Sequence, residues 1–313
     1  MHSQSTDNFL LKISSRSPGV RLKGGRRARK SPQMHTSSLT SFRSSVWRYW
    51  KKNGRHDLPW RLPTLKLRQG KKDFDPYHIL VSEVMLQQTQ VDRVVPKYQE
   101  FLKAFPNVRM LAKASLSDVL KIWSGLGYNR RGKYLRDAAA EIIARYRGKV
   151  PKEYNALRSL PGVGDYTARA LRVFAFNEPD ILTETNIRTA LIHCFATSSI
   201  RSYRTGLRKV ADRDIFPIAA RTAEGQMPRE WYWALMDYGA HLKRLGVRNN
   251  HKSVHYIKQP KFEGSLRQLR GAILRTLTRG QMIEIRSQSL SKALEGLVKD
   301  GLIRKYNGRW KIA

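Results

Sequence analysis

The chain has 313 residues, of which 60 are Lys or Arg and 24 are Asp or Glu, giving a formal net charge of +36. Its one cysteine, Cys194, excludes disulfides within the chain and any iron–sulfur or zinc site that needs four thiolates. No apolar run approaches the roughly 20 residues that cross a bilayer. A folded body this positive repels itself without an anionic partner, which favours nucleic acid over a membrane surface or a generally basic proteome.

Residues 1–40 are rich in Ser, Arg and Lys, with eight basic groups against the single acid Asp7. They show no sustained periodicity, which predicts a disordered basic tail. The same composition is typical of an organelle transit peptide, and translation from Met34 would remove most of it. These alternatives stay open, and we otherwise expect a cytoplasmic or nucleoid protein of bacterial type.

Residues 41–258 are predicted to form an all-α body, because no segment there shows a strand period as strong as the helical one. Asp75 and Pro76 open one helix, with Asp as N-cap and Pro at the first helical position. Apolar residues at helical spacing are expected to carry this helix to Val91.

Further helices complete the body. Ser117 is expected to cap a helix that ends at Gly125–Gly127. A long helix runs from about Lys133 to Tyr146, helices flank the turn at residues 161–164, and Pro228 precedes the last helix.

Residues 262–313 differ from the body and predict a small α/β module of winged-helix type. Two leucine-rich helical stretches precede two short alternating runs, which Asn307 and Gly308 join in a strong β-hairpin signal. Residues 261–313 hold twelve basic groups against four acidic ones, a net charge of +8. Such modules bind nucleic acid or serve as protein contacts, and the charge favours nucleic acid.

The sequence Leu160-Pro-Gly-Val-Gly164 predicts a hairpin turn that can hold a phosphate between two helices. Gly162 and Gly164 allow positive φ angles and let a phosphate approach the amides around Val163. The helix that follows adds the positive end of its dipole. An ordinary turn between helices is the alternative.

Glu83 lies in the most apolar helical stretch, on one face with Ile79, Leu80 and Gln87. A carboxyl held among apolar groups has a raised pKa and keeps a proton near neutral pH, as a general acid must. The alternative is a structural Glu bonded to a neighbouring Arg or amide. The polar run Gln87–Gln90 that follows has side chains suited to entering a base stack or binding base edges.

Glu184 stands at the predicted start of a later helix. Asp180 or Thr183 could equally cap that helix, and a structural role for Glu184 is the alternative to a catalytic one. An ionised carboxylate here would complement a protonated Glu83. Cleavage of an N-glycosidic bond needs two such groups, since one protonates the leaving base and the other stabilises the sugar cation or directs water onto it.

Five segments between Asp57 and Ala240 carry a resemblance to a known family. They are Leu58-Pro-Trp-Arg61, Ser82-Glu-Val-Met-Leu-Gln-Gln-Thr-Gln-Val91, Trp123-Ser-Gly-Leu-Gly-Tyr128, Leu160-Pro-Gly-Val-Gly164 and Met236-Asp-Tyr-Gly-Ala240. With these segments the body resembles the helix–hairpin–helix DNA glycosylases, and among them the adenine DNA glycosylases of the MutY type. The resemblance implies two lobes, an inner one at about residues 77–185 and an outer one from residues 41–76 and 186–258.

In that family the enzyme flips adenine, mispaired with 8-oxoguanine or guanine, out of the duplex and hydrolyses its glycosidic bond. The resemblance implies that Glu83 protonates the purine and that Glu184 occupies the position of the second catalytic carboxylate. Tyr166 and Asn186 match residues that line the sugar site. Tyr166 also replaces the lysine of the lyase members, so no Schiff-base step is expected.

The resemblance also implies contacts with the base and with DNA. Trp60 and Arg61 match residues of the base pocket, and Gln88 matches a residue that enters the helix stack. The other residues expected to bind substrate or DNA are Gln87, Thr89, Tyr128, Arg130, Arg131, Arg188 and the turn residues Gly162, Val163 and Gly164.

The sequence departs from the family pattern at four places. Glu184 replaces the catalytic aspartate, and its extra methylene moves the charge on the order of 1 Å, which can cost roughly 100-fold in rate. The cysteines of the iron–sulfur cluster are missing, and residues 243–252 stand in their place with Lys and Arg groups. Asn129 replaces a stack-entering aromatic residue. Residues 262–313 stand where the family has a domain that recognises 8-oxoguanine.

We therefore predict a monofunctional DNA glycosylase without cofactor or metal. We expect a monomer that acts on double-stranded DNA with a mispaired or damaged base, most favourably adenine, and that has no membrane partner. One alternative is a glycosylase for thymine or uracil opposite guanine, or for an alkylated base. The other is a chain that senses lesions without catalysis and recruits a partner through its terminal module.

Overall fold

The computed structural model describes residues 36–64, 74–195, 209–254, 256, 258–285 and 287–313. Most of the predicted basic tail, with its targeting and start-site alternatives, lies outside the described residues. Its predicted boundary at residue 40 is wrong, because α1 (Thr36–Asn53) already begins at Thr36. The body consists of helices and their connections, as predicted.

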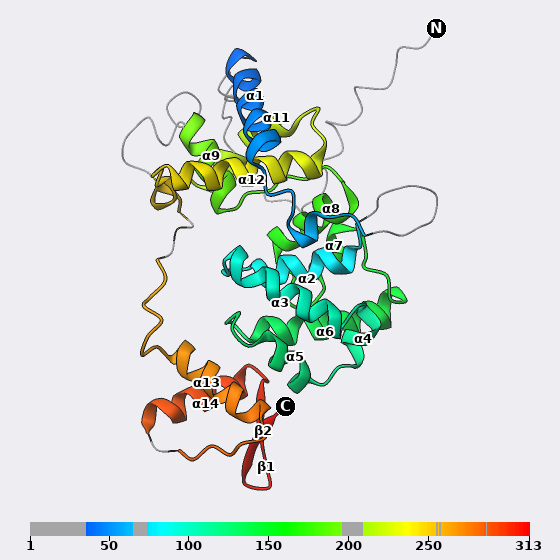
Figure 1. The fold of residues 1–313 in the computed structure, drawn as a ribbon, viewed down its shortest axis with the longest axis vertical. Coiled ribbons are helices and arrows are strands. Elements are labelled where there is room, and N and C mark those ends of the chain that lie inside the picture. Colours follow the sequence, from blue (N-terminus) through cyan, green and yellow to red (C-terminus); the bar gives the residue numbers. More distant parts are fainter. Residues whose placement is uncertain (1–35, 65–73, 196–208, 255, 257, 286) are drawn as a thin grey trace, which may run out of the picture. The chain divides into compact units, whose positions relative to one another are not determined.

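Four long helices pack together as the first group in Figure 1. They are α1, α9 (Thr185–Phe195), α11 (Asp212–Ala223) and α12 (Pro228–Arg244). Phe42 of α1 meets Phe195 of α9 edge-on, with 4.9 Å between ring centroids. Gly239 lets α12 cross α9 closely, because a Cβ there would lie 2.0 Å from the carbonyl oxygen of Asn186.

The second group surrounds α2 (Pro76–Leu86), which packs against α3, α6 and α8. Its other members are η1 (Pro59–Arg61), α3 (Val91–Ala104), α4 (Val108–Lys113), α5 (Leu116–Trp123), α6 (Arg130–Tyr146), α7 (Tyr154–Arg158) and α8 (Asp165–Phe176). One continuous hydrophobic core runs through both groups.

Helix starts follow local capping chemistry, with two corrections to the prediction. The Asp75 side chain accepts a hydrogen bond from the Tyr77 amide at 2.9 Å, which confirms the predicted cap. The predicted continuation of α2 to Val91 is wrong, because Gln88 adopts a φ of 55° and breaks the helix. Ser115, not Ser117, caps α5, since its hydroxyl accepts the amide of Asp118.

The C-terminal module contains α13 (Leu266–Thr278), α14 (Gln288–Lys299) and the antiparallel strands β1 (Ile303–Tyr306) and β2 (Arg309–Ile312). Asn307 and Gly308 have φ angles of 46° and 75°, so the predicted hairpin turn is confirmed. The assignment to the winged-helix type stays a prediction.

The core of the module is completed by the body. Leu116 and Leu120 of α5 are buried in the same hydrophobic cluster as Ile273, Leu274 and Leu297 of the module. Asp300 adds ion pairs with Arg130 of α6 and with Arg270 of α13.

After α12 the chain forms η2 (Asn249–Lys252) and returns to the first group. The amide of Val210 donates to the carbonyl of Lys252 at 2.7 Å, and the amide of Val254 donates to the carbonyl of Val210 at 3.0 Å. Among the described helices, none is both long and apolar enough to cross a membrane.

Candidate active site

A cavity of about 300 Å³ between the two helix groups brings together the two predicted catalytic carboxyls. Glu83 enters it from α2, Tyr166 from α8, and Glu184 and Asn186 from the start of α9. Its wall includes Trp60, Arg61, Gln87, Gln88, Thr89 and Trp233. The cavity therefore contains all four predicted catalytic residues and both predicted base-pocket residues.

Glu83 is a buried carboxyl on an almost wholly apolar helix, with 8% of its surface exposed. Its side chain forms no hydrogen bond with the described residues, unlike the structural Glu of the alternative interpretation. Its pKa is raised to about 8, first by burial and then by the charge of Glu184, while the charge of Arg61 acts in the opposite direction. Glu83 therefore holds a proton at neutral pH.

Glu184 is itself the N-terminal cap of α9. Its Oε1 accepts hydrogen bonds from the backbone amides of Asn186 at 2.7 Å and of Ile187 at 2.8 Å. Burial is the largest influence and leaves the pKa of Glu184 above its ordinary value, although these two amides and the charges of Lys243 and Arg188 act in the opposite direction. The positive end of the α9 dipole also favours a negative charge at this position.

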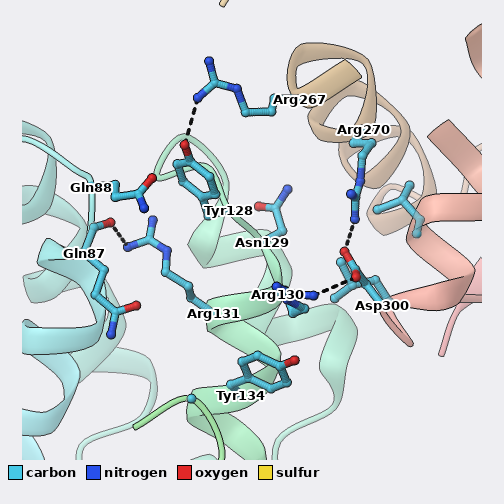
Figure 2. Close-up of a pocket in the computed structure, with 13 residues that line it drawn as sticks. Gln87, Gln88, Tyr128, Asn129, Arg130, Arg131, Tyr134, Arg267, Arg270 and Asp300 are labelled. Atoms are coloured by element: carbon cyan, nitrogen blue, oxygen red, sulfur yellow. Dashed lines mark hydrogen bonds and ion pairs between the residues drawn. The ribbon is translucent and has the colours of Figure 1, made fainter. Parts of the chain in front are cut away.

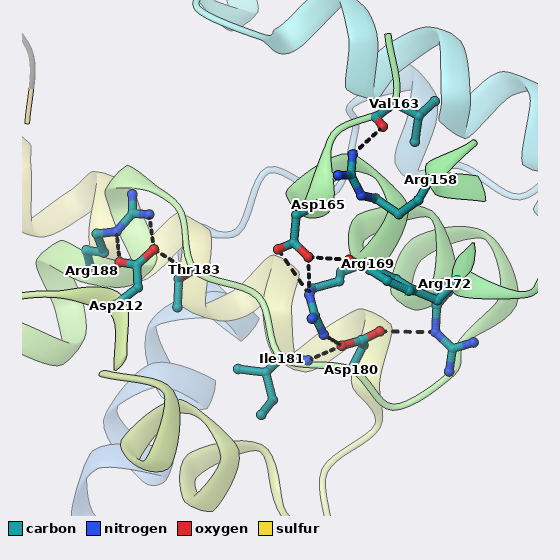
Figure 3. Close-up of polar contacts among 11 residues, drawn as sticks. Arg158, Val163, Asp165, Arg169, Arg172, Asp180, Ile181, Thr183, Arg188 and Asp212 are labelled. Atoms are coloured by element: carbon teal, nitrogen blue, oxygen red, sulfur yellow. Dashed lines mark hydrogen bonds and ion pairs between the residues drawn. The ribbon is translucent and has the colours of Figure 1, made fainter. Parts of the chain in front are cut away.

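The two alternative caps have other partners, as Figure 3 shows. Asp180 accepts the amide of Ile181 at 2.8 Å and forms ion pairs with Arg169 and Arg172. Thr183 donates its hydroxyl to Asp212. The cap at the start of α9 is thus carried by Glu184 alone among the three candidates.

Tyr166 and Asn186 lie beside the carboxyls. Burial raises the pKa of the Tyr166 phenol well above its ordinary value, and the charges of Glu83 and Glu184 raise it further. The phenol therefore stays protonated. The side-chain oxygen of Asn186 accepts a hydrogen bond from Lys243 Nζ at 3.2 Å, which places a cation near Glu184.

Arg61 is fixed in the cavity wall by Asp237 of α12. Its Nη1 and Nη2 contact the two Asp237 oxygens at 2.7 Å and 3.1 Å, and its guanidinium lies 5.4 Å from the ring centroid of Trp233. Arg55 pairs with the same carboxylate. Burial would raise the pKa of Asp237, but the hydrogen bond from Arg61 and the charges of both arginines hold it below its ordinary value.

The turn Gln87–Thr89 is held by Arg131, which is buried at 9% exposure. Arg131 donates to the carbonyls of Val84, Met85 and Gln87 through Nη1 and to those of Leu126 and Gly127 through Nη2. It also donates to the Thr89 hydroxyl at 3.0 Å. The predicted DNA contact of Arg131 does not fit this inward placement, which instead closes the end of α2.

Two predicted DNA-binding residues contact the C-terminal module, as Figure 2 shows, and a third contacts the connection that precedes it. The hydroxyl of Tyr128 accepts Arg267 Nη1 at 2.9 Å, and Arg130 pairs with Asp300 at 3.1 Å. Gln88 Oε1 accepts Nε2 of Gln259, in the connection before α13, at 2.7 Å. These side chains would have to exchange a protein partner for DNA, or bind DNA alongside it.

The predicted hairpin joins α7 to α8. Gly162 has a φ of 75°, and a Cβ there would lie 2.7 Å from the Cβ of Tyr134. Gly164 has a φ of −80°, so of the two glycines only Gly162 uses the positive φ that both allow. Gly164 is the N-cap of α8, and a Cβ there would meet no atom within 4 Å, which leaves room for a close approach. Val163 is buried, and its carbonyl accepts Arg158 Nη1 at 2.9 Å.

Arg188 points toward Asp212 and not toward the cavity. Its Nε and Nη2 contact the two Asp212 oxygens at 2.6 Å and 2.7 Å (Figure 3). The predicted DNA contact of Arg188 does not fit this bidentate ion pair, which joins α9 to α11.

Two functional residues were missed from the sequence. Asp237 lies inside a motif segment, but its partners Arg55 and Arg61 precede it by more than 170 positions. Lys243 lies one turn after Gly239 on α12, where the helix crosses the start of α9. A search for charged residues near Gly239 could have indicated Lys243.

Comparison with known proteins shows which family has this fold and these motifs. Residues 81–211 match the family model described as HhH-GPD superfamily base excision DNA repair protein. The chain is 30% identical over 293 residues to the adenine DNA glycosylase of Mycolicibacterium smegmatis, covering 84% of this chain and 94% of that protein. It is 33% identical over 210 residues to the adenine DNA glycosylase of Mus musculus, covering 65% of this chain and 38% of that protein.

Another relative and a solved structure have different names. The thymine/uracil-DNA glycosylase of Pyrobaculum aerophilum is 30% identical over 202 residues, covering 64% of this chain and 81% of that protein. The structure of a thermostable thymine-DNA glycosylase shares the fold with a TM-score of 0.54 at 24% identity, covering 70% of this chain and 93% of that one.

The helical body, its hairpin turn and the two carboxyls in one cavity fit the class that these comparisons show, a base-excision enzyme. The chain belongs to the HhH-GPD superfamily of base excision DNA repair proteins, and within it to the MutY-like DNA N-glycosylases, which are hydrolases.

Proposed function

We propose that this glycosylase removes adenine mispaired with guanine or 8-oxoguanine from duplex DNA. The observation that carries the proposal is Glu83, a buried carboxyl whose pKa of about 8 keeps it protonated, in one cavity with Glu184. The names of the mycobacterial and mouse relatives support adenine as the target.

The first step is extrusion of the base, which costs a few kcal/mol and costs least at a mismatch. Gln88, which lines the cavity, leaves its partner Gln259 and fills the gap left in the stack. The hairpin at Gly162–Gly164 and the positive end of α8 hold the phosphate backbone. The extruded base then lies between Trp60, Arg61 and Glu83.

The second step breaks the bond between the base and the sugar. The Glu83 carboxyl gives its proton to a ring nitrogen, and the electron pair of the C1′–N bond leaves with the base. Glu184 stabilises the positive sugar that remains. Water adds to C1′, its released proton returns to Glu83, and the products are a free base and an abasic site.

The enzyme is proposed to be monofunctional and monomeric and to need no cofactor. Tyr166 stands where a Schiff-base mechanism needs an amine, and none of the described residues lining the cavity is a lysine. A four-thiolate iron–sulfur cluster does not fit a chain with one cysteine. Hydrogen bonds between Val210 and residues 252–254 fasten the segment after α12 instead.

Single-turnover base release tests the proposal on short duplexes with adenine opposite guanine, 8-oxoguanine or thymine. Release from the first two, but not from the normal pair, is expected. Glu83→Gln should reduce the rate by roughly 10²- to 10⁴-fold. Glu141→Gln changes a Glu on α6 whose side chain is 44% exposed, and it should leave the rate unchanged. No release by the wild type, or full release by Glu83→Gln, contradicts the mechanism.

A second candidate is removal of thymine or uracil opposite guanine. It is favoured by the relative from Pyrobaculum aerophilum, which has that name at 30% identity. The same experiment with these two duplexes separates the candidates. Tight, salt-dependent binding with no release from any duplex, unaltered by Glu184→Gln, would instead indicate a lesion-binding protein.

A further inference from the structure

The hairpin of the C-terminal module has two chemically different faces. The register pairs Ile303 with Ile312 and Arg304 with Lys311. Because side chains alternate along a strand, Ile303 and Ile312 share the face that packs on the module core. The opposite face has only Arg304, Tyr306, Arg309 and Lys311, and we call it the basic face.

The basic face is open to solvent and carries no acid. All four of its residues are exposed, and Tyr306 exposes 54% of its surface. Lys311 Nζ lies 4.9 Å from the centroid of the Tyr306 ring. Within the described part of the chain, Arg304, Arg309 and Lys311 form no ion pair.

Two of these cations face each other directly. Arg304 and Lys311 are cross-strand partners, and like charges in that arrangement destabilise a sheet. The chain thus keeps a repulsive pair on the exposed face of a two-stranded sheet. A bound anionic partner would relieve this repulsion.

The module is also anchored to the glycosylase body. Leu116 and Leu120 are buried in its core, and Arg130 pairs with Asp300 directly before the hairpin. Arg130 and Asp300 line one cleft together with Gly162 of the DNA-holding turn. The hairpin therefore begins beside surfaces to which the proposed function already assigns DNA.

We propose that the basic face of Arg304, Tyr306, Arg309 and Lys311 binds the phosphate backbone of duplex DNA outside the cavity of base removal. The three cations neutralise phosphates, and the flat tyrosine ring packs against the sugar–phosphate chain. The contact adds affinity without reading sequence. It extends the proposed function and does not depend on which base is excised.

The test is binding of an undamaged duplex by the full chain at several salt concentrations. Replacing Arg304, Arg309 and Lys311 together by Ala should weaken binding at least about tenfold at low salt. It should also reduce the slope of log K against log salt by about 2.7, or 0.9 for each lost phosphate contact. Base release at saturating enzyme should change less than about twofold, because the cavity is untouched.

The matched control replaces Arg279, Lys292 and Lys299 by Ala. Lys292 and Lys299 are exposed on α14 and Arg279 is exposed at the end of α13, so the loss of net charge is the same. The proposal is overturned if the control lowers the slope as much as the hairpin variant, or if the hairpin variant keeps the wild-type slope. A retained slope would assign the face to a protein partner.

Single changes guard against a misfolded triple variant. Arg304→Gln and Lys311→Gln each remove the repulsive pair, so each should fold at least as stably as the wild type. Each should still lower the slope by about 0.9. Because undamaged DNA is used, the result is independent of whether Glu83 acts as the acid.

Discussion

Glu83 of α2 and Glu184 at the start of α9 line one cavity, and the charge of Glu184 adds to burial in raising the pKa of Glu83 to about 8. The two carboxyls come from different helix groups, so this coupling exists only in the folded chain. Amide hydrogen bonds fix Glu184 as an acceptor, while the side chain of Glu83 forms no hydrogen bond with the described residues and only the charge of Arg61 favours its ionised form. Burial raises the pKa of both carboxyls, and at Glu184 the two amides and the charges of Lys243 and Arg188 act against this effect.

This coupling predicts the pH dependence of base release. The wild-type single-turnover rate should be level below about pH 8 and fall above it, because a general acid must be protonated. Glu184→Gln removes a neighbouring negative charge, so it lowers the pKa of Glu83. The falling limb should move to lower pH, besides a loss of roughly 10²-fold in rate. Rates measured across this range with both proteins provide the check, and an unmoved limb contradicts the coupling.

Folding stability should depend on pH through the same group. The pKa of Glu83 rises from an ordinary 4.5 to about 8 on folding, so folding binds a proton between these values and wild-type stability declines as pH rises through them. Glu83→Gln should therefore be more stable than the wild type at pH 7, by roughly 3 kcal/mol, and equal to it below pH 4.5. Urea unfolding at several pH values measures the difference. Glu141→Gln should show no such dependence, and a pH-independent gain for Glu83→Gln would refute this assignment.

Asp237→Asn should strongly destabilise the protein. The change leaves the buried guanidinium of Arg61 without its counter-charge. The loss of one partner of a buried ion pair costs about 3–5 kcal/mol in the free energy of unfolding. Glu100→Gln breaks the exposed ion pair with Lys97 and should cost about 0–1 kcal/mol. Thermal or urea unfolding of both variants compares the two costs directly, and equal values would contradict the buried role of Asp237.

Gly239→Ala should separate α9 from α12. The new Cβ would lie 2.0 Å from the carbonyl of Asn186, so the helices must move apart and carry Glu184 with them. We expect the free energy of unfolding to fall by several kcal/mol and base release to be lost. Gly271→Ala in α13 meets only the flexible end of Arg275 at 3.5 Å and should stabilise the chain by roughly 0.5–1 kcal/mol. Unfolding and single-turnover measurements on the pair show whether close helix crossing is the cause.

Structure set by neighbours in the chain could be predicted from the sequence. Asp75 and Pro76 start a helix, and Asn307 and Gly308 turn a hairpin, because each acts within a few residues. The end of α2 could not be predicted from periodicity, since the apolar pattern continues to Val91. Arg131, which is 45 positions away from Leu86, supplies the donors that end the helix.

In the site, too, contacts between residues far apart in the chain could not be predicted from the sequence. The motifs indicated the residues of the cavity, and Glu83, Tyr166, Glu184 and Asn186 do lie together. Charge alone could not separate an arginine that faces solvent from one that is paired inside the protein. Arg188 and Arg131 were therefore predicted to bind DNA, although their partners are Asp212 and the backbone carbonyls around α2.

The burial of Leu116 and Leu120 within the module core has a consequence for shortened forms of the chain. These two side chains expose only 2% and 3% of their surfaces, and module residues cover them. A chain that ends before α13 would expose an apolar surface on α5. Such a shortened enzyme should therefore self-associate and should not work as a smaller active form. A lineage that lost the module would first need polar substitutions at positions 116 and 120.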